Sequence, residues 1–259
     1  MALALVTGGT AGIGYAFAVE LASRGWDLVL VARDTARLDT VAEELRTRFG
    51  HQTETITADL AVRADMLRVA DRLECTESPI EMLVNNAGFG IHASLLDKDF
   101  SIQEKALDVM CLSVLVLSGA AGRAMSARGH GSIINIGSSS GIITTGNYSA
   151  VKAWVNTYTE GLANELRGTG VTVTAVLPGW VHTEFHQRAG INASNLPDLV
   201  WLQADDIARE ALDDNAHGKV ISVPSKRWNA AYWIGRHLPR SAIRALSRKL
   251  SNSRKSPDG

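Results

Sequence analysis

The chain has 259 residues, 46% of them hydrophobic, and a formal net charge of −1. This length suits one large α/β domain, and the near-zero charge argues against a nucleic-acid partner. The two cysteines, Cys75 and Cys111, lie far apart and without neighbouring histidines. We therefore expect neither a disulfide framework nor a zinc site, and a reduced, cytoplasmic location. No apolar run approaches the roughly 18 residues that a membrane span needs.

Apolar strand candidates alternate with helix candidates along the chain. The expected strands are 2–6, 27–32, 53–58, 81–85, 132–136, 171–176 and 220–223. The expected helices are 12–24, 35–49, 65–73, 102–127, 148–166 and 205–214. This alternation predicts a Rossmann-type α/β fold, a doubly wound parallel sheet covered on both faces. Since no linker or repeat interrupts it, we expect a single domain, with a core over 1–223 and a basic helical extension over 224–259.

A glycine-rich segment, TGGTAGIG at 7–14, separates the first strand from the first helix. Small residues let the backbone approach a pyrophosphate, and the helix N-terminus supplies amide donors and a positive dipole. Its place between a strand and a helix predicts a dinucleotide site. The alternative is a tight turn without a ligand.

The end of the second strand bears on which dinucleotide binds. An NAD site places a carboxylate about 20 residues after the glycines, but Ala32 occupies that position. Arg33 follows, and its guanidinium fork suits a 2′-phosphate. Asp34 argues against NADP(H), because its carboxylate can neutralise the charge of Arg33 or itself accept from the ribose hydroxyls. The sequence favours NADP(H) over NAD(H).

Tyr148 and Lys152 lie four residues apart on a predicted helix and therefore share a face. A cation within about 4–6 Å lowers the pKa of a tyrosine, which makes it a usable general acid or base. Ser138 follows the preceding strand, where its hydroxyl can stabilise charge on a substrate oxygen. Ser139 is the alternative for that role, and a surface pair is the alternative for Tyr148 and Lys152.

Five motifs in this order resemble those of the classical short-chain dehydrogenase/reductase family: the glycine segment, Asp59-Leu60, Asn85-Asn86-Ala87-Gly88, Tyr148-x-x-x-Lys152 and Pro178-Gly179. The resemblance implies an oxidoreductase that interconverts a ketone or aldehyde and an alcohol. It assigns Tyr148 as proton donor or acceptor, Lys152 as the group that lowers its pKa and holds the nicotinamide ribose, and Ser138 as the third catalytic residue. The cofactor contacts it implies are Gly8, Thr10, Gly12, Ile13, Gly14, Arg33, Asp59, Leu60, Asn86, Ala87, Gly88, Tyr148, Lys152, Pro178, Gly179, Val181 and Thr183.

The chain departs from the family pattern at two places. Met110 occupies the position of a relay asparagine, and a thioether is at best a weak acceptor. Ser138 and Tyr148 are only ten residues apart, which a shortened loop at 142–146 explains. His182 and His186 have helical spacing for a metal pair, but no third ligand is evident, so we expect no metal.

The segment 184–202 is the expected substrate loop. An apolar substrate is favoured by apolar residues expected near the cleft, namely Leu95, Leu96, Ile142, Ile143, Trp180 and Trp201. The main rival function is a non-catalytic NADP(H)-binding sensor or scaffold, which only Met110 favours. A sugar-nucleotide epimerase on the same fold is a third alternative, but such an enzyme would have a longer chain. The resemblance also implies a homodimer or homotetramer, formed through the helices 102–127 and 148–166.

The last segment differs in composition. Residues 226–255 contain nine lysines and arginines and no acid, interleaved with apolar residues, and Pro239 separates two helix candidates. Four interpretations stay open: an ordinary surface helix, peripheral contact with an anionic membrane, a cap on the substrate cleft, or a subunit contact.

Overall fold

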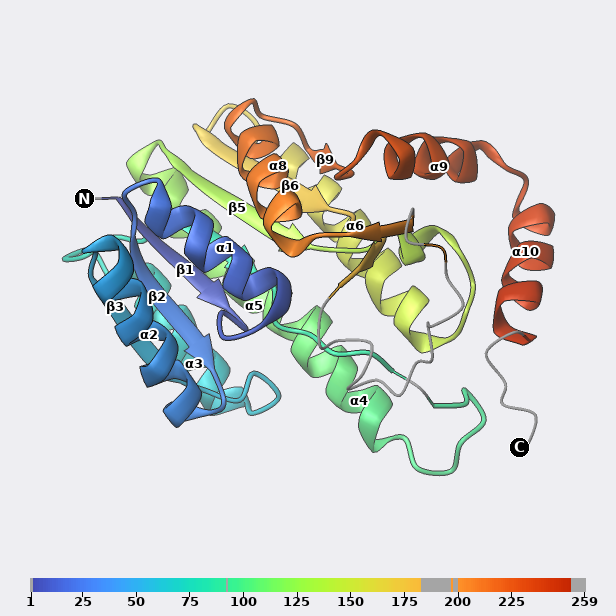
Figure 1. The fold of residues 1–259 in the computed structure, drawn as a ribbon, viewed down its shortest axis with the longest axis horizontal. Helices are drawn as coiled ribbons and strands as arrows, with labels where there is room; N and C mark the ends of the chain where they lie inside the picture. Colours follow the sequence, from blue (N-terminus) through green and yellow to red (C-terminus); the bar gives the residue numbers. More distant parts are fainter. Residues whose placement is uncertain (1, 92, 183–196, 198–199, 253–259) are drawn as a thin grey trace.

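The computed structural model describes residues 2–91, 93–182, 197 and 200–252. Seven parallel strands form a sheet in the order β3-β2-β1-β4-β5-β6-β9 (Figure 1). In chain order they are β1 (Leu3–Thr7), β2 (Asp27–Ala32), β3 (Thr53–Thr57), β4 (Met82–Asn85), β5 (Gly131–Ile136), β6 (Val171–Val176) and β9 (Ile221–Ser222). The predicted doubly wound, Rossmann-type sheet in a single domain is confirmed.

Helices cover both faces of the sheet, which explains why the central strands β1, β2 and β4 are largely apolar on both faces, whereas the edge strand β3 is polar. They are α1 (Gly12–Ser23), α2 (Thr35–Phe49), α3 (Arg63–Glu74), α4 (Ser101–Leu107), α5 (Ser113–Arg128), α6 (Asn147–Glu165) and α8 (Ala204–Ala216). One core cluster packs α1, α2 and α8 against the sheet, and the other packs α3, α5 and α6 against the opposite face.

The order of the strands reverses at β1, which pairs with β2 on one side and with β4 on the other. In a doubly wound sheet, the crevice at such a switch point lies outside the carboxyl ends of the strands and binds the ligand. The loops after β1, β2, β4 and β5 all leave the sheet at this edge. They carry the motifs that the sequence singles out.

The long helix predicted over 102–127 consists of α4, a π-helical segment over Asp108–Leu112 and α5. Over Ser101–Arg128 it is long and apolar enough to cross a membrane, so the expectation that no segment reaches that length is wrong. The most apolar part of this helix is 61% buried inside the protein. It therefore packs as a core helix against the sheet.

The carboxyl-terminal part adds two short strands and two helices. The strands, β7 (Trp180–Val181) and β8 (Trp201–Leu202), pair in parallel and are too short for sequence periodicity to predict. The helix α9 (Lys226–His237) extends past the sheet, and α10 (Arg240–Asn252) turns back along the side of the molecule (Figure 1). Pro239 separates them, as the sequence predicts. Thr183, His186 and most of the expected substrate loop lie outside the described residues.

Candidate active site

A single cavity of about 1480 Å³ lies at the carboxyl ends of the strands. Ligand pockets are typically about 300–1,000 Å³, so this cavity has room for a dinucleotide and a second molecule. Most of the predicted site residues line it: Gly8, Thr10, Gly12, Ile13, Arg33, Asp59, Leu60, Asn86, Ala87, Gly88, Ser138, Tyr148, Lys152, Pro178, Gly179 and Val181.

The loop after β1 forms a cradle of backbone. Gly8 (φ +65°) and Gly12 (φ +53°) adopt the left-handed conformation that favours glycine, and both line the cavity. Gly14 is different: it is buried outside the cavity lining, and a Cβ there would collide with the Gly8 carbonyl. Gly14 is therefore needed for close packing beneath the cradle, and its expected contact with the cofactor stays a prediction.

The asparagines after β4 hold the neighbouring loops together. The Asn86 Nδ2 donates to the carbonyl oxygens of Thr7 (3.0 Å) and Gly8 (3.2 Å). The Asn85 Nδ2 donates to Asn135 Oδ1 (2.9 Å) on β5 and to Ser118 Oγ (3.0 Å) on α5. These contacts fix the cradle relative to the strand that leads to Ser138.

Two arginines stand at the end of β2. Arg33 is exposed and lines the cavity. The Asp34 carboxylate caps α2 by accepting from the Arg37 amide (3.1 Å), so it is engaged at the helix terminus. Arg37, which the sequence analysis missed, also lines the cavity, and its Nε donates to the Thr10 carbonyl (3.0 Å). Its position four residues after Arg33 was the available signal.

Asp59 follows β3 and lines the cavity beside Leu60. Its Oδ1 accepts from the Ala61 amide (3.0 Å), and its Oδ2 lies 3.3 Å from the Lys105 ammonium. Partial burial acts to raise the pKa of Asp59, but the Ala61 amide and Lys105 outweigh burial and hold the pKa below its usual value. The carboxylate is therefore ionised at neutral pH.

Tyr148 and Lys152 lie one turn apart on α6, and both line the cavity. The Lys152 Nζ is 5.9 Å from the centre of the Tyr148 ring and donates to the Ile136 carbonyl at 2.7 Å. Removal from water raises the pKa of Tyr148 to about 12, although its hydrogen bond with Ser138 acts to lower it. The predicted net lowering of this pKa is therefore wrong, because desolvation outweighs the hydrogen bond with Ser138.

Sulfur side chains occupy the region behind Lys152. Met110 is buried in an apolar cluster that Tyr148 joins, and its Sδ lies 3.0 Å from where a Cβ on Gly88 would stand. Burial lowers the pKa of Lys152 to about 8, while Cys111 acts to raise it. Burial also raises the pKa of the Cys111 thiol to about 11.

The structure distinguishes the two candidate serines. The Ser138 hydroxyl hydrogen-bonds with Tyr148, and its oxygen also accepts from the Ser140 amide (3.0 Å). The Ser139 hydroxyl instead donates to the Pro178 carbonyl (3.1 Å). The geometry therefore favours Ser138 over Ser139 as the partner of Tyr148.

Asn156, which the sequence analysis missed, joins the Ser138 turn to α6. Its Nδ2 donates to the Ser138 carbonyl (3.0 Å), and its Oδ1 accepts from the Ser138 amide (3.3 Å). A Cβ on Gly137 or Gly141 would collide with the Asn156 amide. Tyr148, Lys152 and Asn156 follow at four-residue steps on one helix face, and this spacing was the available signal.

The apolar residues expected near the cleft divide into two groups. Ile142, Ile143 and Trp180 line the cavity. Leu95 and Leu96 are exposed and do not line it, so their expected placement is corrected. Trp201 is also outside the lining. Its ring packs edge-on against that of Trp180, with 5.8 Å between the ring centres, and stacks on the His182 ring.

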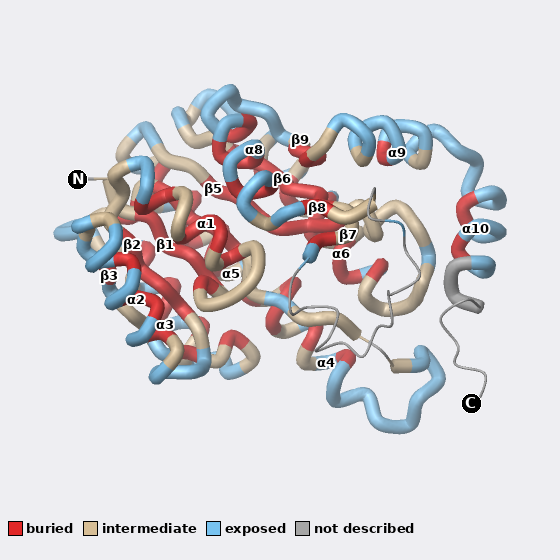
Figure 2. The backbone as a smooth tube through the Cα atoms, in the orientation of Figure 1, coloured by how far each residue is buried: buried red, intermediate tan, exposed pale blue. Residues whose placement is uncertain are grey.

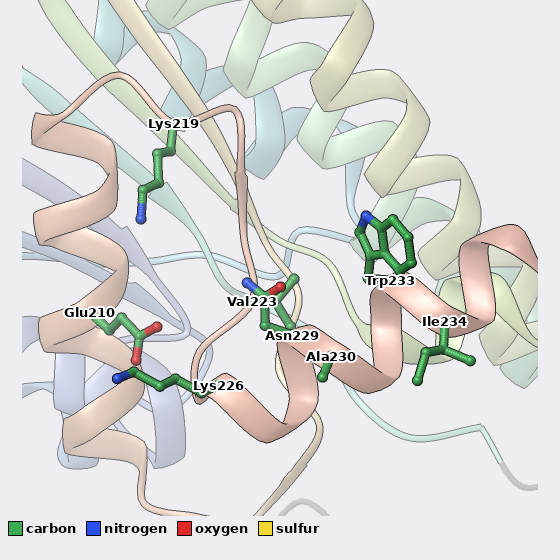
Figure 3. Close-up of a pocket in the computed structure, with 8 residues that line it drawn as sticks. All are labelled: Glu210, Lys219, Val223, Lys226, Asn229, Ala230, Trp233 and Ile234. Carbon is green, nitrogen blue, oxygen red and sulfur yellow. The ribbon is translucent and has the colours of Figure 1, made fainter.

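A smaller hollow of about 670 Å³ lies between α8 and α9 (Figure 3). It is lined by Glu210, Lys219, Val223, Lys226, Asn229, Ala230, Trp233 and Ile234. None of these residues belongs to the sequence motifs. The larger cavity is therefore the candidate active site.

Sequence comparison identifies relatives along most of the chain. The family model described as short chain dehydrogenase matches residues 2–193. The chain is 37% identical over 215 residues to the galactitol 2-dehydrogenase (L-tagatose-forming) of Cereibacter sphaeroides, covering 80% of this chain and 82% of that protein.

Solved structures resemble the whole chain. A short-chain dehydrogenase from Sphingobium yanoikuyae, solved in complex with NADPH, superposes with a TM-score of 0.83 at 31% identity, covering 100% of this chain and 98% of that one. A bulky-bulky ketone specific alcohol dehydrogenase from Comamonas testosteroni superposes with a TM-score of 0.78 at 28% identity, covering 100% and 96%. With its sheet order, its motifs and the family match in agreement, the chain belongs to the short-chain dehydrogenase family of oxidoreductases.

Proposed function

We propose that the chain is an NADP(H)-dependent oxidoreductase that interconverts a ketone or aldehyde and an alcohol, with Tyr148 as the acid/base. The observation that carries this proposal is the convergence of Ser138, Tyr148 and Lys152 on the cavity that the glycine cradle also lines. The Sphingobium relative, solved with NADPH, supports the choice of cofactor.

Residues of this chain fit a nicotinamide dinucleotide at both ends of the cradle. The backbone at Gly8 and Gly12, with the N-terminus of α1, suits a pyrophosphate. Arg33 and Arg37 place two guanidinium groups where a 2′-phosphate would bind. When bound, the nicotinamide supplies or accepts the hydride, and Lys152 would hold its ribose.

The side chains supply the proton and stabilise the developing charge. Because the pKa of Tyr148 is about 12, its phenol is protonated at neutral pH and can donate to a carbonyl oxygen. The Ser138 hydroxyl can donate a hydrogen bond to the same oxygen as it becomes negative. In the reverse direction, Tyr148 accepts the proton of the alcohol.

Replacing Arg33 with serine is expected to lower kcat/KM for NADPH by about 10–100-fold and to change the value for NADH little. A charge-assisted hydrogen bond contributes about 1.5–3 kcal/mol. NADH has no 2′-phosphate, so its binding does not depend on this hydrogen bond. Steady-state kinetics with both cofactors measures the ratio. Arg48→Ser is the matched control, since Arg48 lies at the far end of α2 and outside the cavity lining. Equal losses with NADPH and NADH would contradict the assignment of Arg33.

The catalytic proposal is tested by the oxidation of NADPH, followed by absorbance, with a panel of ketones and aldehydes. We expect turnover of apolar ketones, because Ile142, Ile143 and Trp180 line the cavity. The rival non-catalytic sensor or scaffold would bind NADPH without oxidising it. Binding without turnover of any carbonyl compound would favour that rival.

We also propose self-association through the outer faces of α4–α5 and α6. It is supported by exposed apolar side chains on these helices, Leu107 and Leu115, and by the stacked pair Trp154 and Tyr158 (4.8 Å) on α6. Homodimers, homotetramers and contact of the basic extension with a membrane stay predictions.

A further inference from the structure

We propose that the apolar face of α10 is the far wall of the substrate cavity, and that the substrate is a ketone or alcohol with a bulky apolar body that contacts Leu246. This inference rests on the proposed function, because it assumes that the carbonyl lies at Tyr148. It assigns the role of the carboxyl-terminal extension and the size of the substrate.

The cavity that begins at the glycine cradle continues without interruption to the two carboxyl-terminal helices. Beside Ile142, its wall consists of residues of α9, α10 and the turn between them. These are Trp228, Ala231, Tyr232, Ile234, Gly235, Leu238, Ile243 and Leu246. None of them is charged, although the two helices carry many cations. The end of the cavity beyond Tyr148 is therefore apolar.

The extension is fastened to the loop that precedes Tyr148. The Thr144 amide donates to Ser247 Oγ (2.9 Å), and the Arg240 Nη1 donates to the Ile142 carbonyl (3.2 Å). Gly235 packs so closely on Ile142 that a Cβ there would stand 2.5 Å from its Cδ1. These contacts fix α10 relative to the start of α6, where the proposed acid/base lies.

The start of α9 is fixed as firmly. The Trp228 indole donates to the Val200 carbonyl (3.0 Å), and its ring covers Gly179, where a Cβ would collide with it. Ser225 has a φ of +77°, which is strained for a residue other than glycine, and its amide donates to Glu210 Oε2 (3.1 Å). This turn directs α9 across the end of the cavity.

The amphipathic pattern of α10 is oriented toward the protein. Ile243 and Ser247 are only 2% and 1% exposed, while Arg244 and Arg248 face solvent. Figure 2 shows the buried residues of α10 on the side turned toward the rest of the protein. Of the interpretations that the sequence left open, this orientation favours a wall of the cleft, because Ile243 and Ser247 on the inner side of α10 are already buried against the protein.

Of the two α10 residues that line the cavity, Ile243 is buried, whereas Leu246 is 46% exposed. Ile234 on α9 and Leu238 in the turn are exposed as well. A large apolar side chain left half-exposed in a concave wall gains free energy when a ligand covers it, at about 25 cal/mol per Å² of apolar surface. The lining residues of α10 offer no side-chain donor or acceptor to a hydroxyl group. A polyhydroxylated substrate would therefore lose hydrogen bonds to water without replacing them.

The test compares the variants Leu246→Trp and Ala245→Trp on ketones of increasing size. Both variants add an indole to α10, but Ala245 is exposed and outside the cavity lining. The ketones are cyclohexanone, 2-decalone and a four-ring 3-ketosteroid, reduced with NADPH. We expect wild-type kcat/KM to rise at least tenfold from one ring to four. Leu246→Trp should lower that ratio at least tenfold, since about this much discrimination comes from a methylene-sized change in an apolar pocket, and Ala245→Trp should preserve it.

Binding without turnover separates this inference from the proposed function. Calorimetric titration of the four-ring ketone is carried out in the presence of NADP⁺, which cannot reduce it. We expect Leu246→Trp to weaken binding at least tenfold and Ala245→Trp to change it less than twofold. If no ketone is reduced, the proposed function fails, and this titration alone decides the role of the wall. Equal effects of the two variants, or no binding of the four-ring ketone to the wild type, would overturn the inference.

Discussion

Replacing Tyr148 with phenylalanine is expected to lower kcat for ketone reduction by about 10²–10⁴-fold, the usual contribution of a general acid or base. The substitution removes one hydroxyl and keeps the ring, so packing against the apolar cluster around Met110 is preserved. The hydrogen bond with Ser138 is lost, and with it the proton that the product oxygen needs.

The matched control is Tyr158→Phe on the same helix. Tyr158 stacks on Trp154 and donates its hydroxyl to the Leu115 carbonyl (3.4 Å), but it lies outside the cavity lining. Steady-state measurements at saturating NADPH and ketone give kcat, and fluorescence titration gives cofactor affinity. Affinity should be similar in both variants. If Tyr148→Phe keeps wild-type turnover, the assignment of Tyr148 as the acid is wrong.

Because the pKa of Tyr148 is raised, ketone reduction and alcohol oxidation should depend differently on pH. Below about pH 12 the phenol stays protonated, so ionisation of Tyr148 does not limit ketone reduction in the neutral range. Alcohol oxidation needs the phenolate as base, and its fraction grows with pH up to that pKa. The rate of oxidation should therefore rise between pH 6 and about pH 9 in the wild type, and this rise should disappear in Tyr148→Phe.

The fold could be predicted from sequence because its signals are local. Each buried strand is a short apolar run, and α2 shows its apolar face in Leu38, Val41 and Leu45. The π-helical segment over Asp108–Leu112 could not be predicted, because it adds one residue to a turn inside a continuous apolar helix. The pairing of β7 with β8 depends on tertiary contacts between residues 21 positions apart.

The site could be predicted only where its residues stand in motifs. Arg37 and Asn156 belong to none, and each becomes visible once its helix is placed beside the cavity or the Ser138 turn. The direction of the Tyr148 pKa shift was predicted wrongly for a related reason. Helical spacing shows that Lys152 is near, but only the packed structure shows how strongly burial opposes ionisation.

Replacing Asn156 with leucine is expected to lower kcat about 10–100-fold with a smaller change in KM. The side-chain amide makes both hydrogen bonds that tie the Ser138 backbone to α6. Without them Ser138 loses its fixed position beside Tyr148, although neither catalytic side chain is altered. The free energy of unfolding should also fall, by about 1–3 kcal/mol for the groups left unpaired.

Two further variants separate positioning from stability. Thr159→Val, one turn further along α6, removes the hydroxyl that accepts a buried hydrogen bond from the Asn135 Nδ2 (3.0 Å), and should lower stability without lowering kcat.

Asn156→Asp should recover activity as the pH falls. A protonated carboxyl can accept from the Ser138 amide and donate to the Ser138 carbonyl, as the wild-type amide does, whereas a carboxylate can only accept. Burial raises the pKa of such a carboxyl, so the kcat ratio of wild type to Asn156→Asp should be smaller at pH 5.5 than at pH 8. A ratio that does not change with pH would show that Asn156 does not act through its hydrogen bonds to Ser138.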